Sequence, residues 1–483
     1  MIESPSKPGP NTALILLAGF ACILALCGGT SNPGSPQDVI LRPACALLLV
    51  PALYWWPRGA SETSRAPLYF VLAWAIWTGL QLVPLPTGLW SVLPDRALVA
   101  ELDQLLGVEG QWRPISWVPS RGWNALAGMV VPICALVLAM AARARSATLL
   151  NLLLGVALLD ATMNFLQLVS GGQDTFYLYR PHPGQTDGLF SNENHSGVFS
   201  AVGLLVTARL ALASRGNKQA GWMIGYGAAY LVFLLAVLVG GSRAALVAGL
   251  GALLASGVMF YAALEAKGGG ASIARWVPAS PGRRRMVMLF VPAAFFAAMV
   301  GLFIWLERSP SFDGVLTRNS FEDLRWELAP ILGEMIAKNW LLGIGFGAFE
   351  EYYHIYEPTG LMLSKFINQA HNDWGQVILE GGLPAVAIAL ALAAWVARAL
   401  MGVLRRDQDG WSLVVFWLSV IAIVAAASLI DYPVRTPIFQ VALVWLLLVL
   451  GRDESGSEPT ERLLASSVAG ARWDKRRRRH RWR

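Results

Sequence analysis

Charged residues are scarce in this sequence. Asp, Glu, Lys and Arg make up 14% of it, whereas 55% of the residues are hydrophobic and the mean hydropathy is +0.51. Soluble domains carry roughly a quarter charged residues, so this chain has too few to cover a water-facing surface. The shortage excludes an ordinary soluble protein and places most of the chain in a membrane.

Cysteine is also rare. The four cysteines, Cys22, Cys27, Cys45 and Cys134, lie within apolar runs, without metal-ligand spacing or a histidine close by in the sequence. Their expected role is therefore packing. The sequence also lacks an A-x-A type cleavage site after its first apolar run, so we expect that run to be a retained helix. It has no internal repeat of the kind found in many transporters.

Long apolar runs are what the sequence has instead. Runs of about 20 residues can cross a bilayer as helices, which satisfy the backbone hydrogen bonds that lipid cannot. The runs are continuous rather than alternating, unlike the strands of a membrane barrel. Twelve spans are predicted: 13–30, 39–56, 67–84, 122–142, 147–169, 195–214, 222–241, 244–264, 286–306, 374–401, 411–430 and 436–451.

The charges between the spans predict their orientation. Basic loops follow spans 2, 4, 6, 8 and 10, and the intervening connections are longer or more acidic. Because Lys and Arg favour the cytoplasmic side, twelve spans with both termini cytoplasmic satisfy every loop. The predicted fold is an all-α polytopic inner-membrane protein of about twelve transmembrane helices. Its predicted parts are a cytoplasmic leader (1–12), spans 1–9 (13–306), a partly helical outer loop subdomain (307–373), spans 10–12 (374–451) and a basic cytoplasmic tail (452–483).

The tail carries a signal of its own. Between Arg472 and Arg483 there are eight Lys or Arg residues and one Asp. Such a segment is attracted to anionic lipid headgroups, and an acidic cytoplasmic partner is the alternative. Nucleic-acid binding is not expected of so short a tail beside a membrane.

The outer segment 307–373 contains ten acidic and five basic residues. Its apolar residues at 321, 324, 328, 331, 332 and 335 have helix spacing, which predicts an amphipathic helix at the membrane interface, bent by Pro330. Arg325 lies beside the apolar stripe and either reaches inward or pairs with Glu322. The glycines at 343, 345 and 347 lack a preceding strand, so dinucleotide binding is rejected.

Two arginines are candidates for anion binding. Arg243 interrupts the apolar runs 222–241 and 244–264. A charge within a membrane span costs about 2.5–3.5 kcal/mol at mid-helix, so it either closes a tight outer hairpin or faces a cavity that receives an anion. Arg180 opens an ordered polar turn and offers a planar fork suited to phosphate or carboxylate. Asn194 or Ser191 can cap the helix that follows this turn.

The segment around His371 is the sharpest feature. This histidine stands at the outer membrane boundary, among amides and two carboxylates, which suits a general base. Asp373 and Glu380 are seven residues apart and share a helix face, whereas His371 lies about half a turn out of phase with Glu380. Glu380 therefore cannot orient His371 within one straight helix. Asp373 with Gln376 also fits a capping box, and an interfacial histidine with ordinary hydrogen bonds is the alternative for His371.

These motifs together resemble the O-antigen ligase and Wzy-type polymerase family of bacterial membrane proteins. The resemblance covers roughly 150–445 and rests on motifs in matching order around the long outer loop. The family's usual Asn-Pro-Asn reads Asn192-Glu-Asn194 here. The matching positions are Arg180 with Gly-Leu-Phe-Ser-Asn-Glu-Asn, Ser-Arg-Ala-Ala at 242–245, Arg325, the segment 339–349, His371-Asn372 and Glu380-Gly-Gly.

The resemblance implies glycan transfer from a polyprenyl diphosphate carrier to an acceptor hydroxyl, in the periplasm and without nucleotide sugar, metal or other cofactor. It implies that His371 is the base and that Arg180, Arg243 and Arg325 hold the diphosphate. Asn192, Asn194, Asn372, Asp373 and Glu380 would support them. The segment 307–373 becomes a periplasmic loop subdomain, and the acceptor is a lipid, glycan or protein hydroxyl.

Three functions stay open at this point. A ligase joins polymer to an acceptor, and a Wzy-type polymerase joins carrier-linked repeat units by the same chemistry. A transporter or flippase for a lipid-linked glycan would need charges near mid-membrane, for which Asp160 in the fifth span is the clearest candidate.

Overall fold

The computed structural model of the chain describes most of the apolar sequence. Its described residues are 10–56, 62–171, 176–179, 186–214, 220–240, 242–265, 320–361, 367–406 and 410–456, with single residues between 282 and 301. Several predicted features lie outside the described residues: Arg180, the basic end of the tail, and the predicted span at 286–306 apart from single residues. The side chain of Arg325 also lies outside them.

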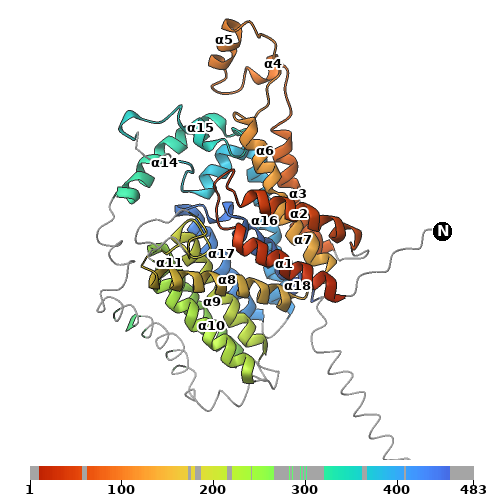
Figure 1. Cartoon of the computed structure of the whole chain (residues 1–483), viewed down its shortest axis with the longest axis vertical. Helices are drawn as coiled ribbons and strands as arrows, with labels where there is room; N and C mark the ends of the chain where they lie inside the picture. Colours follow the sequence, from red (N-terminus) through yellow and green to blue (C-terminus); the bar gives the residue numbers. More distant parts are fainter. Residues whose placement is uncertain are drawn as a thin grey trace, which may run out of the picture.

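The described residues form helices, with an isolated bridge between Leu85 and Arg113. Apart from 286–306, each predicted span overlaps a helix of the structure (Figure 1). The helices before the outer loop are α1 (Pro10–Cys27), α2 (Asp38–Tyr54), α3 (Glu62–Leu80), α4 (Thr87–Trp90), α5 (Ala97–Leu105), α6 (Pro119–Gly128), α7 (Val130–Ala141), α8 (Ser146–Val169), α9 (Glu193–Ala213), α10 (Ala220–Val239) and α11 (Arg243–Glu265). Those after it are α14 (Ser320–Asn339), α15 (Phe349–Tyr353), η3 (Thr359–Leu361), α16 (Asp373–Arg406), α17 (Gly410–Ile430), η4 (Pro433–Arg435) and α18 (Pro437–Ser455).

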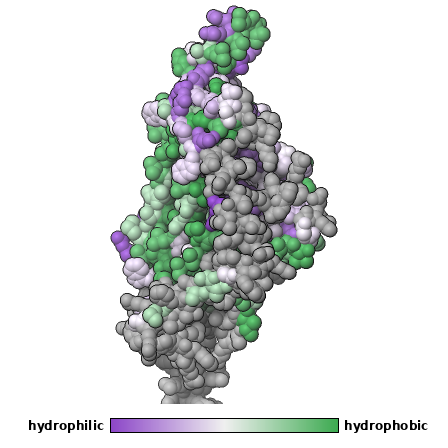
Figure 2. Space-filling view, turned by 90° about the vertical axis from the view of Figure 1, so that its left-hand side faces the viewer, coloured by the Kyte–Doolittle hydropathy of each residue, from purple (hydrophilic) through white to green (hydrophobic). Residues whose placement is uncertain are grey.

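Six described helices are long and apolar enough to cross a membrane. Two shorter apolar helices cover Thr12–Cys27 and Ile224–Val239. These helices confirm the predicted all-α membrane protein, whereas the number of about twelve spans stays a prediction. In Figure 2, hydrophobic residues gather along the body of the described surface, and hydrophilic residues are concentrated nearer the projecting tip.

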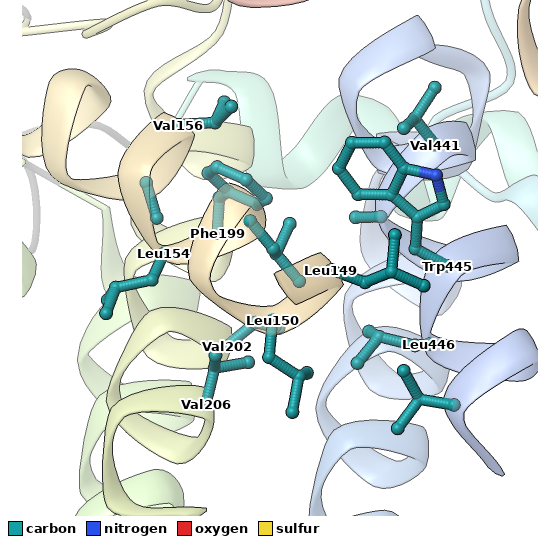
Figure 3. Packing of buried hydrophobic residues seen from close by; sticks show 14 of the residues in the cluster. Leu149, Leu150, Leu154, Val156, Phe199, Val202, Val206, Val441, Trp445 and Leu446 are labelled. Carbon is teal, nitrogen blue, oxygen red and sulfur yellow. The ribbon is translucent and has the colours of Figure 1, made fainter. Parts of the chain in front are cut away.

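Helix α9 lies at the centre of the bundle. Of its most apolar stretch, 83% is buried within the protein, more than in any other candidate span among the described helices. Figure 3 shows α8 packed between α9 and α18, with Leu149 and Leu150 of α8 close to Val202 and Trp445. Because lipid tails are as apolar as leucine, such helices associate through close packing rather than through the hydrophobic effect.

Glycines allow three helices to approach closely. A Cβ atom built on Gly197 of α9 would lie 2.2 Å from the Cβ of Ala245 on α11. One built on Gly203 of α9 would lie 2.9 Å from the ring of Phe233 on α10. Small residues at helix contacts are the usual device for close packing in a membrane. The close contact at Gly197 brings the start of α9 against the start of α11, where candidate residues of both helices lie.

Helix α16 is broken near its beginning. Gly382 has φ 61° and ψ −161°, and Pro384 follows two residues later. Because proline has no N–H, it cannot bond the carbonyl of Glu380, four residues before it. That carbonyl instead accepts the backbone N–H of Gly345 at 3.0 Å and the side-chain amide of Gln81 at 2.8 Å. The glycine-rich loop after α14 therefore packs against the break in α16, and its backbone N–H groups donate to carbonyls of that helix.

Helix α14 confirms the helix predicted from the apolar spacing, with Pro330 inside it. Its stripe, however, packs within the protein: Leu328, Leu332 and Met335 are buried against α15 and the start of α16. The small helices α4 and α5 project beyond α3 and α6 at the same end of the molecule (Figure 1). The hydroxyl of Tyr352 in α15 donates to Asp95 at 2.6 Å and ties this projection to the loop subdomain.

Candidate active site

Asp431 is the centre of a polar cluster between α17 and α18. It directly follows α17 and is 3% exposed. Asn194 donates its side-chain amide to Oδ2 at 2.7 Å, and Asn192 donates to the same oxygen at 3.2 Å. The backbone N–H of Tyr432 donates to Oδ1 at 3.0 Å. Three hydrogen bonds from uncharged donors thus fix this carboxylate in place.

His371 faces the same carboxylate. Its Nδ1 lies 3.4 Å from Oδ1 of Asp431, and its side chain is 24% exposed. The ring of Tyr432 meets it edge-on at 4.9 Å between centroids. Because Nδ1 points at the carboxylate, Nε2 is the ring nitrogen left to act on a substrate. An imidazole, a carboxylate that can orient it and access from solvent are therefore found at one point.

The backbone conformation of His371 explains why its side chain does not follow the helical spacing of α16. His371 has φ 49°, a left-handed conformation, and stands two residues before the helix begins. Asn372 caps α16, since its Oδ1 accepts the N–H of Gly375 at 2.9 Å. The predicted capping box of Asp373 and Gln376 is therefore wrong: the cap is one residue earlier, and Gln376 reaches back to the N–H of Ala370 at 2.9 Å. The left-handed turn directs His371 toward Asp431 instead of Glu380.

Glu380 and Asp373 share a different partner. Arg435, in η4, lies 3.2 Å from Asp373 Oδ1 through Nε and donates from Nη1 to Glu380 Oε2 at 3.0 Å. Glu380 also accepts the side-chain amide of Gln376 at 3.0 Å. These two carboxylates therefore hold the start of α16 against η4, and the expectation that Glu380 does not orient His371 agrees with this geometry.

Asn192 caps α9. Its Oδ1 accepts the N–H of Asn194 at 2.8 Å, so neither Asn194 nor Ser191 is the cap that the sequence suggested. Asn192 thus has two roles, since its amide nitrogen also donates to Asp431. The same turn is joined to the loop after α1, because Ser191 donates to Thr30 Oγ1 at 3.2 Å and to Gly29 O at 3.1 Å through its N–H.

Arg243 is the first residue of α11, beside the cluster. The preceding Ser242 donates to Asn194 Oδ1 at 2.6 Å and accepts the N–H of Ala245 at 3.1 Å. Two side chains, Ser242 and Asn194, thus connect the start of α11 to Asp431. The N-terminal end of a helix carries partial positive charge and unpaired N–H groups, which favour phosphate. Arg243 adds a fixed cation at this end.

Asp160 has a different environment from the one a transport site needs. Its Oδ1 accepts the N–H of Leu189 at 2.7 Å and its Oδ2 accepts the hydroxyl of Ser196 at 2.7 Å. Two turns further along α8, Gln167 bonds both the N–H and the carbonyl of Gly188, at 2.8 and 3.0 Å. Polar residues of α8 therefore hold the 186–191 turn, which leads into Asn192.

The electrostatics of Asp431 follow from its neighbours. Burial alone would raise the pKa of its carboxyl, but interactions with His195 and His371 outweigh burial and hold this pKa well below the ordinary value of 3.8. Asp431 is therefore ionised at neutral pH and acts only as an acceptor. Among the residues that the structure describes, no group of three or more His, Cys, Asp or Glu side chains could hold a metal ion.

The structure thus brings together His371, Asn192, Asn194 and the start of α11 with Arg243. It places Asp373 and Glu380 in a neighbouring ion-pair network and Asn372 at a helix cap. Sequence reasoning missed Asp431, Arg435 and the buried His195. The available signal was the charged pair in the short connection between the last two apolar runs, Asp431-Tyr-Pro-Val-Arg435.

Fold and site together define a multi-pass helical membrane protein with a histidine–carboxylate pair beside a cationic helix terminus. Residues 228–390 match the family model described as O-antigen ligase. The chain carries a domain of this family, which confirms the resemblance seen in the motifs. The match includes Arg243, Arg325, His371, Asp373 and Glu380, and ends before Asp431. Among curated proteins, none matches the chain. This match supports a role in glycan transfer for surface polysaccharide biosynthesis.

Proposed function

We propose that this protein transfers a glycan from a polyprenyl diphosphate carrier to an acceptor hydroxyl. The observation that carries the proposal is the pair of His371 and Asp431, in which Nδ1 of His371 faces the carboxylate and the histidine side chain is 24% exposed. Catalytic hydrogen bonds are often long before substrate binds, so a separation of 3.4 Å suits a resting site.

The proposed step is a direct displacement. The acceptor oxygen forms a bond to the anomeric carbon of the donor while the bond from that carbon to the phosphate oxygen breaks. The hydroxyl proton passes to His371 Nε2, and the ionised Asp431 stabilises the imidazolium that forms. The electron pair of the broken bond leaves on the diphosphate. Attack on the side opposite the leaving group inverts the anomeric configuration.

The leaving group needs positive charge. A diphosphate accumulates negative charge as it departs, and preorganised guanidinium groups and helix N–H groups stabilise this charge without a metal ion. Arg243 and the start of α11 supply both in our proposal. Arg180 and Arg325 are proposed as further diphosphate ligands on the resemblance alone, because both side chains lie outside the described part of the chain.

The proposed orientation places this site at the periplasmic face of the bacterial inner membrane. The support is the distribution of basic loops, which favours twelve spans with both termini cytoplasmic. The segment 307–373 is then a periplasmic subdomain between spans 9 and 10, and the basic tail contacts anionic lipid.

A ligase is the first candidate and a Wzy-type polymerase the second, because both use the same step on different acceptors. The residue that favoured a transporter was Asp160. Its carboxylate accepts hydrogen bonds from the Leu189 N–H and the Ser196 hydroxyl, so it no longer supports that alternative. A strain that lacks the gene decides among them. Accumulation of full-length, carrier-linked polymer on the outer leaflet supports a ligase, and accumulation of single carrier-linked repeats there supports a polymerase. Carrier-linked glycan retained on the inner leaflet would contradict both transferase proposals.

A further inference from the structure

A second histidine faces the carboxylate of Asp431. His195, in the first turn of α9, is 1% exposed, and its Nε2 lies 3.7 Å from Oδ1 of Asp431. His371 approaches the same oxygen at 3.4 Å from the exposed side. One carboxylate oxygen is therefore shared by a buried imidazole and a partly exposed one.

Aromatic rings enclose His195. Tyr432 meets its ring edge-on at 5.1 Å between centroids, and Phe190 and Phe439 lie at 6.2 and 6.4 Å. Within the part of the chain that the structure describes, neither ring nitrogen has a hydrogen-bond partner, although both are buried. A buried polar group without a hydrogen bond is costly, so a packing role alone would favour an apolar residue at this position. Asp431 is the acceptor toward which Nε2 is directed.

We propose that His195 is a positioning residue, which acts through Asp431 to set how strongly this carboxylate stabilises a proton on His371. The inference rests on the proposed role of His371 as the base. With its Nε2–H directed at Oδ1, His195 offsets part of the negative charge of the carboxylate. When His371 accepts the proton of the acceptor hydroxyl, Asp431 stabilises the new charge only to the extent that His195 leaves it available.

The ionisable groups that face His195 come from three described segments. Asp431 and Tyr432 lie between α17 and α18, Asp373 is at the start of α16, and His371, before α16, lies across the carboxylate of Asp431 from His195. Asp373 is itself paired with Arg435. Of these, Asp431 is the one in ion-pair range of both histidines, so a change at His195 reaches His371 through this carboxylate.

The test compares two substitutions of opposite chemistry in the full-length protein, reconstituted in vesicles with a polyprenyl-diphosphate-linked glycan and an acceptor. His195→Phe keeps an aromatic ring but removes the N–H, and His195→Gln places an amide N–H near the position of Nε2. At a pH on the acid limb of the rate profile, we expect His195→Phe to lower the transfer rate by about tenfold, because a limb moved up by one pH unit leaves about a tenth of the base in its neutral form. His195→Gln should stay within about threefold of the unsubstituted protein on the same scale.

The pH profile separates positioning from packing. Without His195, Asp431 acts on His371 alone and holds its proton more strongly, so the base is lost at a higher pH. We expect the acid limb of the transfer rate to move up by roughly one pH unit in His195→Phe and to stay in place in His195→Gln. If His195→Phe does not fold, His195→Asn replaces it, because its shorter amide lies near Nδ1 and does not reach Asp431.

Three outcomes decide the inference. An unchanged rate and pH profile in His195→Phe, with His371→Ala inactive, overturns the role of His195 and leaves the proposed function standing. Equal losses in the Phe and Gln variants with no shift of the acid limb indicate packing only, and also overturn it. An active His371→Ala variant defeats the proposed function itself. His354→Phe is the matched control, because this histidine is exposed and pairs with Glu357.

Discussion

Two buried aspartates in this protein have nearly equal burial and opposite surroundings. Asp160 is 0% exposed, and the donors to its carboxylate are a backbone N–H and a serine hydroxyl. Asp431 is 3% exposed, and its neighbours include two imidazoles, one of which reaches solvent. A carboxylate that faces only fixed neutral donors stabilises a local structure. A carboxylate that faces a titratable, accessible ring can take part in proton transfer.

The largest expected effect lies on the accessible side of Asp431. His371→Ala removes the proposed base and should lower glycan transfer by about 10²- to 10⁴-fold, the range for general-base catalysis. Expression and thermal unfolding should change little, because the side chain is partly exposed. Transfer by purified protein in vesicles measures the loss. His354→Ala, at an exposed histidine, should retain full activity.

The next effect tests Asp431 itself. Asp431→Asn keeps the shape of the side chain but removes the charge that stabilises protonated His371. We expect transfer to fall by about 10²-fold, the lower end of what general-base catalysis contributes, because the imidazole itself remains. Initial rates at saturating donor and acceptor check this. A rate within twofold of the unsubstituted protein would show that the carboxylate has no part in the step.

The opposite pattern is expected at Asp160. Asp160→Asn leaves the Leu189 N–H or the Ser196 hydroxyl facing an NH₂ group, which should cost about 1–3 kcal/mol of stability for one unsatisfied buried group. Unfolding in detergent should therefore occur at a lower temperature, while transfer per folded molecule stays within about threefold. Thr162→Val is the control on the same helix, since its hydroxyl is exposed and bonds Leu158 O. A stable but inactive Asp160→Asn would remove the distinction between the two aspartates.

The smallest effect concerns acid stability. The pKa of Asp431 is lower in the folded protein than the ordinary 3.8, so its ionised form stabilises the fold above about pH 4. That contribution should disappear as the pH falls through the lowered value. The difference in unfolding temperature between the unsubstituted protein and Asp431→Asn should accordingly narrow below about pH 4. A difference that does not narrow as the pH falls below about 4 would contradict the lowered pKa.

The membrane helices were predictable because the signal for each one lies within its own stretch of sequence. A helix such as α8 or α17 needs a continuous apolar run, and hydropathy finds that run directly. The break in α16 was only partly accessible. Pro384 and the paired glycines before it are local signals, but the docking of Gly345 onto Glu380 joins residues on different elements.

The site was predictable only in its most unusual residue. His371 stood out as a histidine at a membrane boundary, and Arg243 as a charge within an apolar stretch. Asp431 and His195 did not stand out, because their importance lies in their distance from His371 in space. The caps show the same limit at short range: Asn192 and Asn372 are the caps, although neighbouring polar residues fitted the sequence pattern equally well.

We assign the transfer reaction to the residues around Asp431, whereas Asp160 and its hydrogen-bond partners stabilise the fold. The most direct test of this assignment measures glycan transfer per folded molecule for His371→Ala and Asp160→Asn in one preparation of vesicles, with the same carrier-linked donor. We expect a loss of at least about 10²-fold for the first and near-normal transfer for the second. Near-normal transfer by His371→Ala, with activity lost in folded Asp160→Asn, would contradict the assignment.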